Sequence, residues 1–200
     1  MKRATTLPFF AVLAVAGAVF AGCNANDQSA PAPPGASGSI AEAQQVQAAP
    51  LPGYQVSVPE LHLDAAPLVP LGLNPDGTIQ VPPLSKPKEL GVYTKGPMPG
   101  QNGPAIILGH VNSGGVDGAF AHLPDLKAGD TVTTTAPGGQ TTKFKVYRTQ
   151  VVDKAGFPTS GVYSDTKGPE LRLITCGPGP LDSSGHNYLK QTIVYAKKGA

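Results

Sequence analysis

Thr142-Lys143-Phe144-Lys145-Val146-Tyr147 alternates polar and apolar side chains from Lys143 to Val146. Successive side chains of an extended strand point to opposite faces, so this pattern predicts a strand with one buried and one exposed face. Other short runs are rich in β-branched, aromatic or aliphatic residues, at 55–58, 79–81, 105–108, 130–136, 171–175 and 192–195. Seven or eight such strands predict an all-β fold, either a closed barrel or a sandwich.

The composition supports this prediction and excludes several other classes. The chain has 25 glycines and 22 prolines among 200 residues, and both residues oppose the interior of a helix. A helical bundle or coiled coil is therefore excluded, and only 120–126 suggests a short helical turn. Turn signals at 74–77, 97–100 and 137–139 separate the expected strands. Two cysteines cannot staple a mini-protein, and a chain of this length can bury one core without disulfides.

The first residues are typical of an export signal. Two basic residues precede an apolar stretch at 7–22, which is shorter than the roughly 20 residues that span a bilayer. The stretch ends in Val19-Phe20-Ala21-Gly22-Cys23, which resembles the lipobox of bacterial lipoproteins. We therefore predict a signal peptide at 1–22 and a lipidated Cys23 that tethers the protein outside the cell. A plain signal peptide and an uncleaved membrane anchor remain as alternatives.

Residues 23–52 are mostly Ala, Pro, Ser, Gly and Gln, which is typical of a flexible tether before a folded domain at 53–200. Without the two basic residues of the leader, 13 basic residues balance 13 acidic ones and form no basic run. This balance gives nucleic-acid binding no support. We expect His62 at an outward-facing strand position and His122 and His186 on surface loops. No metal-ligand spacing is present, so we predict no metal and no cofactor.

Cys176 and His110 are the candidates for chemistry. Cys176 ends the apolar run 171–175 and is followed by Gly177-Pro178-Gly179-Pro180, whereas His110 follows the apolar run 105–109. A strand that opens into a loop exposes its last side chain. A histidine close to a cysteine can lower the pKa of the thiol and later protonate a leaving amine. A buried, inert thiol and a Cys23–Cys176 disulfide are the alternatives, and proximity to His110 is a hypothesis for the structure.

Two segments resemble the signature segments of sortases, the cysteine transpeptidases of the bacterial cell surface. They are Gly109-His110-Val111-Asn112-Ser113 and Leu173-Ile174-Thr175-Cys176-Gly177. The resemblance is to the actinobacterial class E/F group in particular. It extends over about residues 55–196, in the same order as in that group, through 69–77, 81–84, 103–110, 169–176 and 193–196.

This resemblance implies a closed eight-stranded sortase-type barrel with short helical turns. It implies that Cys176 is the nucleophile and His110 the general acid and base. We also expect Thr175 and Asn112 along the substrate groove, and Arg172 either in a structural role or at the rim of the groove. The substrate would be a Leu-Pro-x-Thr-Gly-like sorting signal on a surface protein, cleaved through a thioacyl enzyme. An amine of the cell wall or of another protein would then take the acyl group. No nucleic acid and no cofactor are implied.

The sequence departs from the family at the third catalytic residue, which in sortases is an arginine of the last strand. When the sequence is aligned with the family at 193–196 and read backwards, Leu189 falls at the arginine position. A leucine can neither donate a hydrogen bond nor carry charge. Lys190 could fill the oxyanion role only if a bulge re-aims it, because neighbouring side chains on a strand face opposite ways. Losing one oxyanion donor typically costs about 10²- to 10³-fold in rate. The alternative function is therefore a catalytically impaired lipoprotein that binds a peptide or a cell-wall component.

Overall fold

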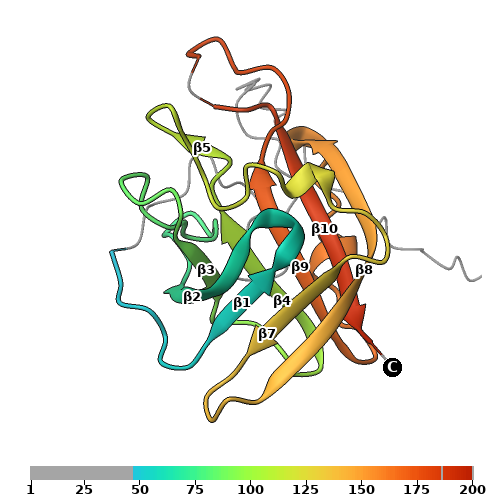
Figure 1. Ribbon diagram of the computed structural model, residues 1–200. Helices are drawn as coiled ribbons and strands as arrows, with labels where there is room; N and C mark the ends of the chain where they lie inside the picture. Colours follow the sequence, from blue (N-terminus) through green and yellow to red (C-terminus); the bar gives the residue numbers. More distant parts are fainter. Residues whose placement is uncertain (1–46, 186, 200) are drawn as a thin grey trace, which may run out of the picture.

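A computed structural model describes residues 47–185 and 187–199. The predicted signal peptide, Cys23 and most of the 23–52 tether lie outside these residues. Within the described part, eight strands close a barrel in the order β1-β2-β3-β4-β9-β10-β8-β7 (Figure 1). They are β1 (Gln55–Val58), β2 (Leu63–Leu71), β3 (Leu90–Tyr93), β4 (Gly103–Gly109), β7 (Thr131–Thr135), β8 (Thr141–Asp153), β9 (Pro169–Cys176) and β10 (Lys190–Lys198). The predicted all-β, closed eight-stranded barrel is confirmed.

The remaining elements are short. β5 (Asn112–Ser113) and β6 (Val116–Asp117) form a small hairpin after β4. Three single 3-10 turns, η1 (Pro59–Leu61), η2 (Leu123–Asp125) and η3 (Lys154–Gly156), and one helix, α1 (Thr159–Tyr163), complete the described chain. The helical turn expected near 120–126 is η2.

Alternation along the strands produces two apolar clusters. The barrel interior takes side chains from all eight strands, among them Val56, Leu68, Val92, Ile107, Val132, Phe144, Leu173 and Val194. A second cluster lies on the outer face of β2, β3, β4, β9 and β10, and includes Val69, Tyr93, Ile106, Leu108, Ile174, Ile193 and Tyr195. Residues of the β2–β3 connection and of the β8–β9 connection cover this outer face, because Ile79, Val81, Phe157 and Val162 belong to the same cluster.

Some predicted elements differ from the structure. The run at 79–81 is not a strand: Ile79 makes only an isolated bridge to Leu73, although Ile79 and Val81 are buried in the outer cluster. The prediction was wrong because the apolar side chains of this run are buried in a connection between strands and not in a strand. His62 is exposed, but it lies at the left-handed end of η1 (φ 54°) and not in a strand.

Candidate functional site

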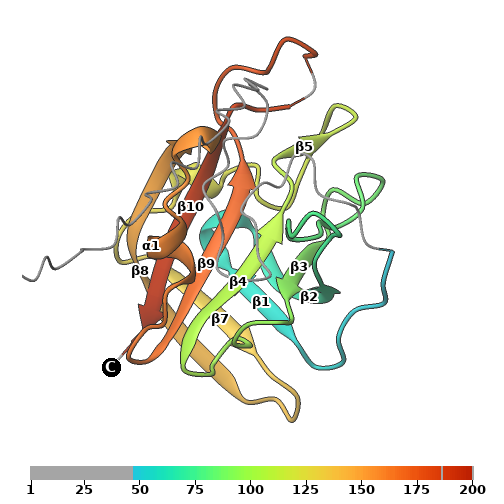
Figure 2. The ribbon, with the colours of Figure 1, turned by 180° about the vertical axis from the view of Figure 1, so that it is seen from behind.

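The strand register places Cys176 and His110 side by side. β4 and β9 are parallel neighbours, and their last matched pair is Leu108 with Ile174 (Figure 2). His110 and Cys176 each follow two residues later, so they lie level with one another on the face that Leu108 and Ile174 share. Neighbouring strands are about 4.8 Å apart, which brings the two backbones within reach of a direct contact between side chains. The two residues that the sequence singled out thus lie at the same ends of neighbouring parallel strands.

The ring of His110 is oriented by the β2–β3 connection. Its Nε2 lies 2.7 Å from the carbonyl oxygen of Pro82. A carbonyl only accepts hydrogen bonds, so Nε2 carries the proton and Nδ1 is the nitrogen that can take up another. The backbone is also fixed, because Phe120 N–H donates to the His110 carbonyl at 3.0 Å, and a Cβ at Gly118 would overlap that same oxygen. The ring and the backbone of His110 are therefore each held by a hydrogen bond.

Burial governs the protonation of both residues. It lowers the pKa of His110, an effect that the hydrogen bond to Pro82 partly opposes. It raises the pKa of the Cys176 thiol above its usual value, and the positive charge of Lys154 partly opposes that rise. Both shifts favour the neutral forms, a thiol at Cys176 and an uncharged imidazole at His110, near neutral pH.

A raised thiol pKa predicts a particular pH dependence of alkylation. Because the pKa of Cys176 is raised, its thiolate fraction at pH 7.5 is smaller than that of a free cysteine. Iodoacetamide should therefore modify Cys176 more slowly than it modifies free cysteine at pH 7.5, and the rate should still be rising at pH 9. Intact-mass time courses between pH 6 and 10 measure this rate. A plateau reached below pH 8 would contradict the prediction.

Asn112 follows His110 by two residues, in the short strand β5. Its Nδ2 donates to the hydroxyl of Tyr188 at 2.8 Å, and the ring of Tyr188 packs over Gly177, 3.4 Å from where a Cβ would lie. This contact joins the loop after His110 to the loop after Cys176. Asn112 therefore remains a candidate for the groove.

Thr175 does not have the geometry that was predicted for it. It is fully buried and alternates with Cys176 along β9, so its side chain lies on the barrel-interior face. A substrate over Cys176 meets the opposite face of the strand. Thr175 is thus a core residue, and the groove role has no geometric support.

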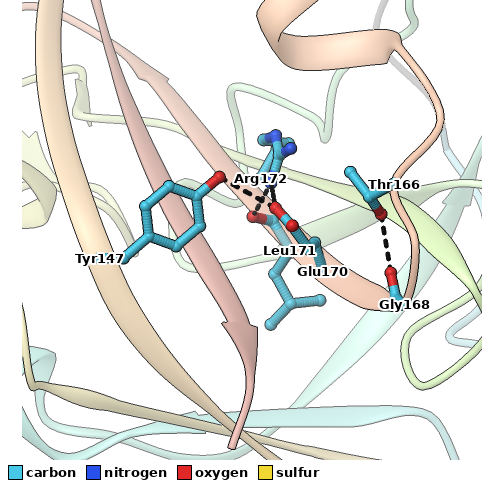
Figure 3. A network of polar contacts seen from close by, with 6 residues as sticks. All are labelled: Tyr147, Thr166, Gly168, Glu170, Leu171 and Arg172. Carbon is cyan, nitrogen blue, oxygen red and sulfur yellow. Dashed lines mark hydrogen bonds and ion pairs between the residues drawn. The ribbon is translucent and has the colours of Figure 1, made fainter.

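Arg172 shares the face of Cys176 but lies four residues earlier on β9 and is 2% exposed. Its Nη1 donates to Glu170 at 2.8 Å and to the carbonyl of Leu171 at 3.0 Å, and Tyr147 donates to the same Glu170 carboxylate at 2.9 Å (Figure 3). The guanidinium also lies 4.8 Å from the ring centre of Tyr195. Of the two roles predicted for Arg172, these contacts and its burial favour the structural one over a place at the rim of the groove.

Lys190 also lies away from the candidate nucleophile. On β10 the residue paired with Cys176 is Gln191, so Lys190 faces the opposite way. Its ammonium is 4.0 Å from the carboxylate of Asp153, and its stem packs against Gly179. This geometry gives no support to the oxyanion role predicted for Lys190. Leu189, which the sequence resemblance aligned with an arginine, is 46% exposed.

Residues 47–185 and 187–199 contain no group of three or more His, Cys, Asp or Glu side chains that could hold a metal ion. In the same part of the chain, no helix is long and apolar enough to cross a membrane.

Comparisons with known proteins agree with this architecture. The family model described as Sortase domain matches residues 56–199. Similar solved structures include a lid mutant of sortase A from Corynebacterium diphtheriae (20% identity, 77% of this chain and 73% of that one, TM-score 0.55). Sortase C-1 from Actinomyces oris is similar at 20% identity, 74% and 73% coverage and TM-score 0.55. Pilus-related sortase C of Group B Streptococcus is similar at 21% identity, with 74% of this chain and 67% of that chain covered and a TM-score of 0.54. No curated protein sequence is significantly similar.

Proposed function

Because this chain belongs to the sortase family, we propose that it is a cell-surface cysteine transpeptidase that acts through Cys176 and His110. The observation that carries the proposal is the placement of these two residues at the ends of adjacent parallel strands, on one face. The motifs quoted above favour the class E/F group within the family. They also favour a Leu-Pro-x-Thr-Gly-like sorting signal on a surface protein as the substrate.

The proposed reaction has two halves. Nδ1 of His110 takes the proton of Cys176, and the thiolate attacks the threonine carbonyl of the sorting signal. The Thr–Gly C–N bond then breaks, the imidazolium protonates the leaving glycine amine, and a thioester to Cys176 remains. In the second half, His110 takes a proton from an incoming amine, which attacks the thioester. The new amide leaves, and the sulfur regains its proton from the imidazolium.

Product analysis tests this function. The purified protein is incubated with a panel of Leu-Pro-x-Thr-Gly-type peptides, with and without triglycine, and the products are separated and weighed. We expect cleavage between Thr and Gly, and a ligated product when the amine is present. An intact panel under all conditions would count against the transpeptidase and in favour of the second candidate.

The second candidate is a sortase-fold lipoprotein that binds a peptide or cell-wall component without turning it over. Leu189 favours it, because a half-exposed leucine at the arginine position supplies no charge and no hydrogen-bond donor. Binding without cleavage, measured by calorimetry with the same peptides, would support this candidate. Cleavage would exclude it.

We also propose the domain plan of the sequence: a lipoprotein signal peptide at 1–22, a tether at 23–52 and the catalytic domain at 53–200. The lipid on Cys23 would hold the protein at the outer face of the membrane; an uncleaved N-terminal segment is the other way to anchor it. Blocking lipoprotein processing with a globomycin-type inhibitor should shift the mass of the membrane-bound protein, because the leader then stays attached. An unchanged mass would contradict lipidation.

A further inference from the structure

Lys154 lies beside the candidate nucleophile although it is far from it in sequence. β10 runs between β8 and β9, and Cys176, Gln191 and Val152 form one row across the three strands. Val152 and Cys176 both pack against the outer cluster, so the row faces outward. The row thus relates the end of β8 to Cys176 across β10.

The pairing continues beyond this row. Lys190 pairs with Asp153, and the backbone N–H of Lys154 then donates to the carbonyl of Leu189 at 2.9 Å. Lys154 is thus the neighbour of Leu189 across the strands. Lys154 is the first residue of η3, two positions after Val152, so this backbone contact places it just past the end of β8, with β10 between it and Cys176.

The distance suits the reach of a lysine. Two strand spacings, about 10 Å, and two residues, about 7 Å along the strand, separate the backbones of Lys154 and Cys176. A flexible four-carbon stem covers much of that separation. In agreement with this placement, the positive charge of Lys154 lowers the pKa of the Cys176 thiol against the effect of burial.

We propose that Lys154 supplies, from the β8–β9 connection, the positive charge at Cys176 that an arginine at the Leu189 position would otherwise supply. The ammonium stabilises the thiolate and then the oxyanion that forms on the substrate carbonyl. The second step rests on the proposed transpeptidase function, whereas the first does not. A charge beside a thiolate in an apolar, partly desolvated setting is worth considerably more than the same charge in bulk water.

The other charged and titratable groups near Cys176 have interaction partners other than Lys154. His110 faces Cys176 from β4 and keeps its bond to Pro82. Asp153 and Lys190 lie 4.0 Å apart, one step along the strands, where the alternation turns side chains to the other face. Removing the charge of Lys154 thus leaves the histidine in place.

The first test is the pH profile of Cys176 alkylation in four proteins: the unaltered chain, Lys154→Met, Lys154→Arg and Lys167→Met. Methionine keeps an apolar stem without the charge, and arginine keeps the charge. Lys167 is exposed and precedes β9, and the first residue of β9 already lies about 23 Å along the strand from Cys176. Circular dichroism and thermal melts verify that all four are folded.

We expect Lys154→Met to shift the profile to higher pH, with alkylation at pH 8 slowed about threefold or more. Lys154→Arg and Lys167→Met should superimpose on the unaltered chain. A Lys154→Met profile that superimposes as well would overturn the proposal, whatever the enzymatic activity.

The second test is turnover of a sorting-signal peptide. Lys154→Met should lower kcat about 10²-fold, and adding Leu189→Arg to that variant should restore much of the loss. An unchanged kcat in Lys154→Met overturns the proposal and leaves the transpeptidase function intact. If the unaltered chain turns over no peptide, the transpeptidase function fails instead, and the alkylation profiles alone decide whether Lys154 acts on Cys176.

Discussion

Replacing His110 with alanine is expected to lower the rate of peptide transfer about 10³-fold. The reason is the protonation state of the site: burial lowers the pKa of His110 and raises that of Cys176, so the resting thiol needs a base to become a nucleophile. The same ring returns a proton to the leaving amine. Steady-state kinetics with a sorting-signal peptide and triglycine measure the loss in kcat.

His122→Ala is the matched control for this variant. His122 is exposed and pairs with Asp125 on the surface, 3.2 Å away, so its removal should leave kcat unchanged. Thermal melts establish that both variants are folded. A His110→Ala protein that keeps more than about a tenth of the activity would refute the assignment of His110 as general acid and base.

Replacing Glu170 with glutamine is expected to lower the free energy of unfolding by about 3 kcal/mol, which is the lower end of the range for a broken buried pair. The carboxylate lies 2.8 Å from Arg172, whose side chain is 3% exposed. Arg148 lies 3.9 Å from the centre of the Tyr195 ring that Arg172 also contacts, so Glu170 offsets positive charge that gathers around one aromatic ring. Denaturant unfolding measures the change.

Asp125→Asn is the matched control, because it makes the same chemical change in an exposed pair with His122. Exposed pairs contribute about 1 kcal/mol or less, so we expect a difference of roughly 2 kcal/mol or more between the two variants. Equal effects would mean that the Glu170–Arg172 pair contributes no more than a surface pair. Alkylation of Cys176 should remain unchanged in Glu170→Gln, since Arg172 lies four residues from the nucleophile on β9.

The sequence predicted most strands that alternate or form an uninterrupted apolar run, but it missed β3, whose four buried residues include a glycine. The run at 142–147 lies within β8, and the run at 171–175 lies within β9. β2 escaped prediction because Pro67 and Pro70 interrupt it, and proline is normally a sign against a strand. The error at 79–81 has the opposite cause, since a buried connection carries the same apolar residues as a strand.

For the site, the sequence predicted the residues at the ends of the strands but not those that other elements bring beside them. Cys176 and His110 follow apolar strands and carry local signals. Pro82 and Lys154 carry none, because their positions depend on the path of one connection and on the pairing of β8 with β10. Burial also depends on tertiary structure. Arg172 lies on the same face of β9 as Cys176, but it is buried there and its contacts are structural.

The most direct measurement of the central claim is the intact mass of the protein after brief incubation with a sorting-signal peptide. Our account predicts an acyl adduct that is absent in Cys176→Ala, that mild hydroxylamine removes as expected of a thioester, and that triglycine discharges into a ligated product. An unmodified mass across the peptide panel, in a protein whose Cys176 still reacts with iodoacetamide, would contradict it.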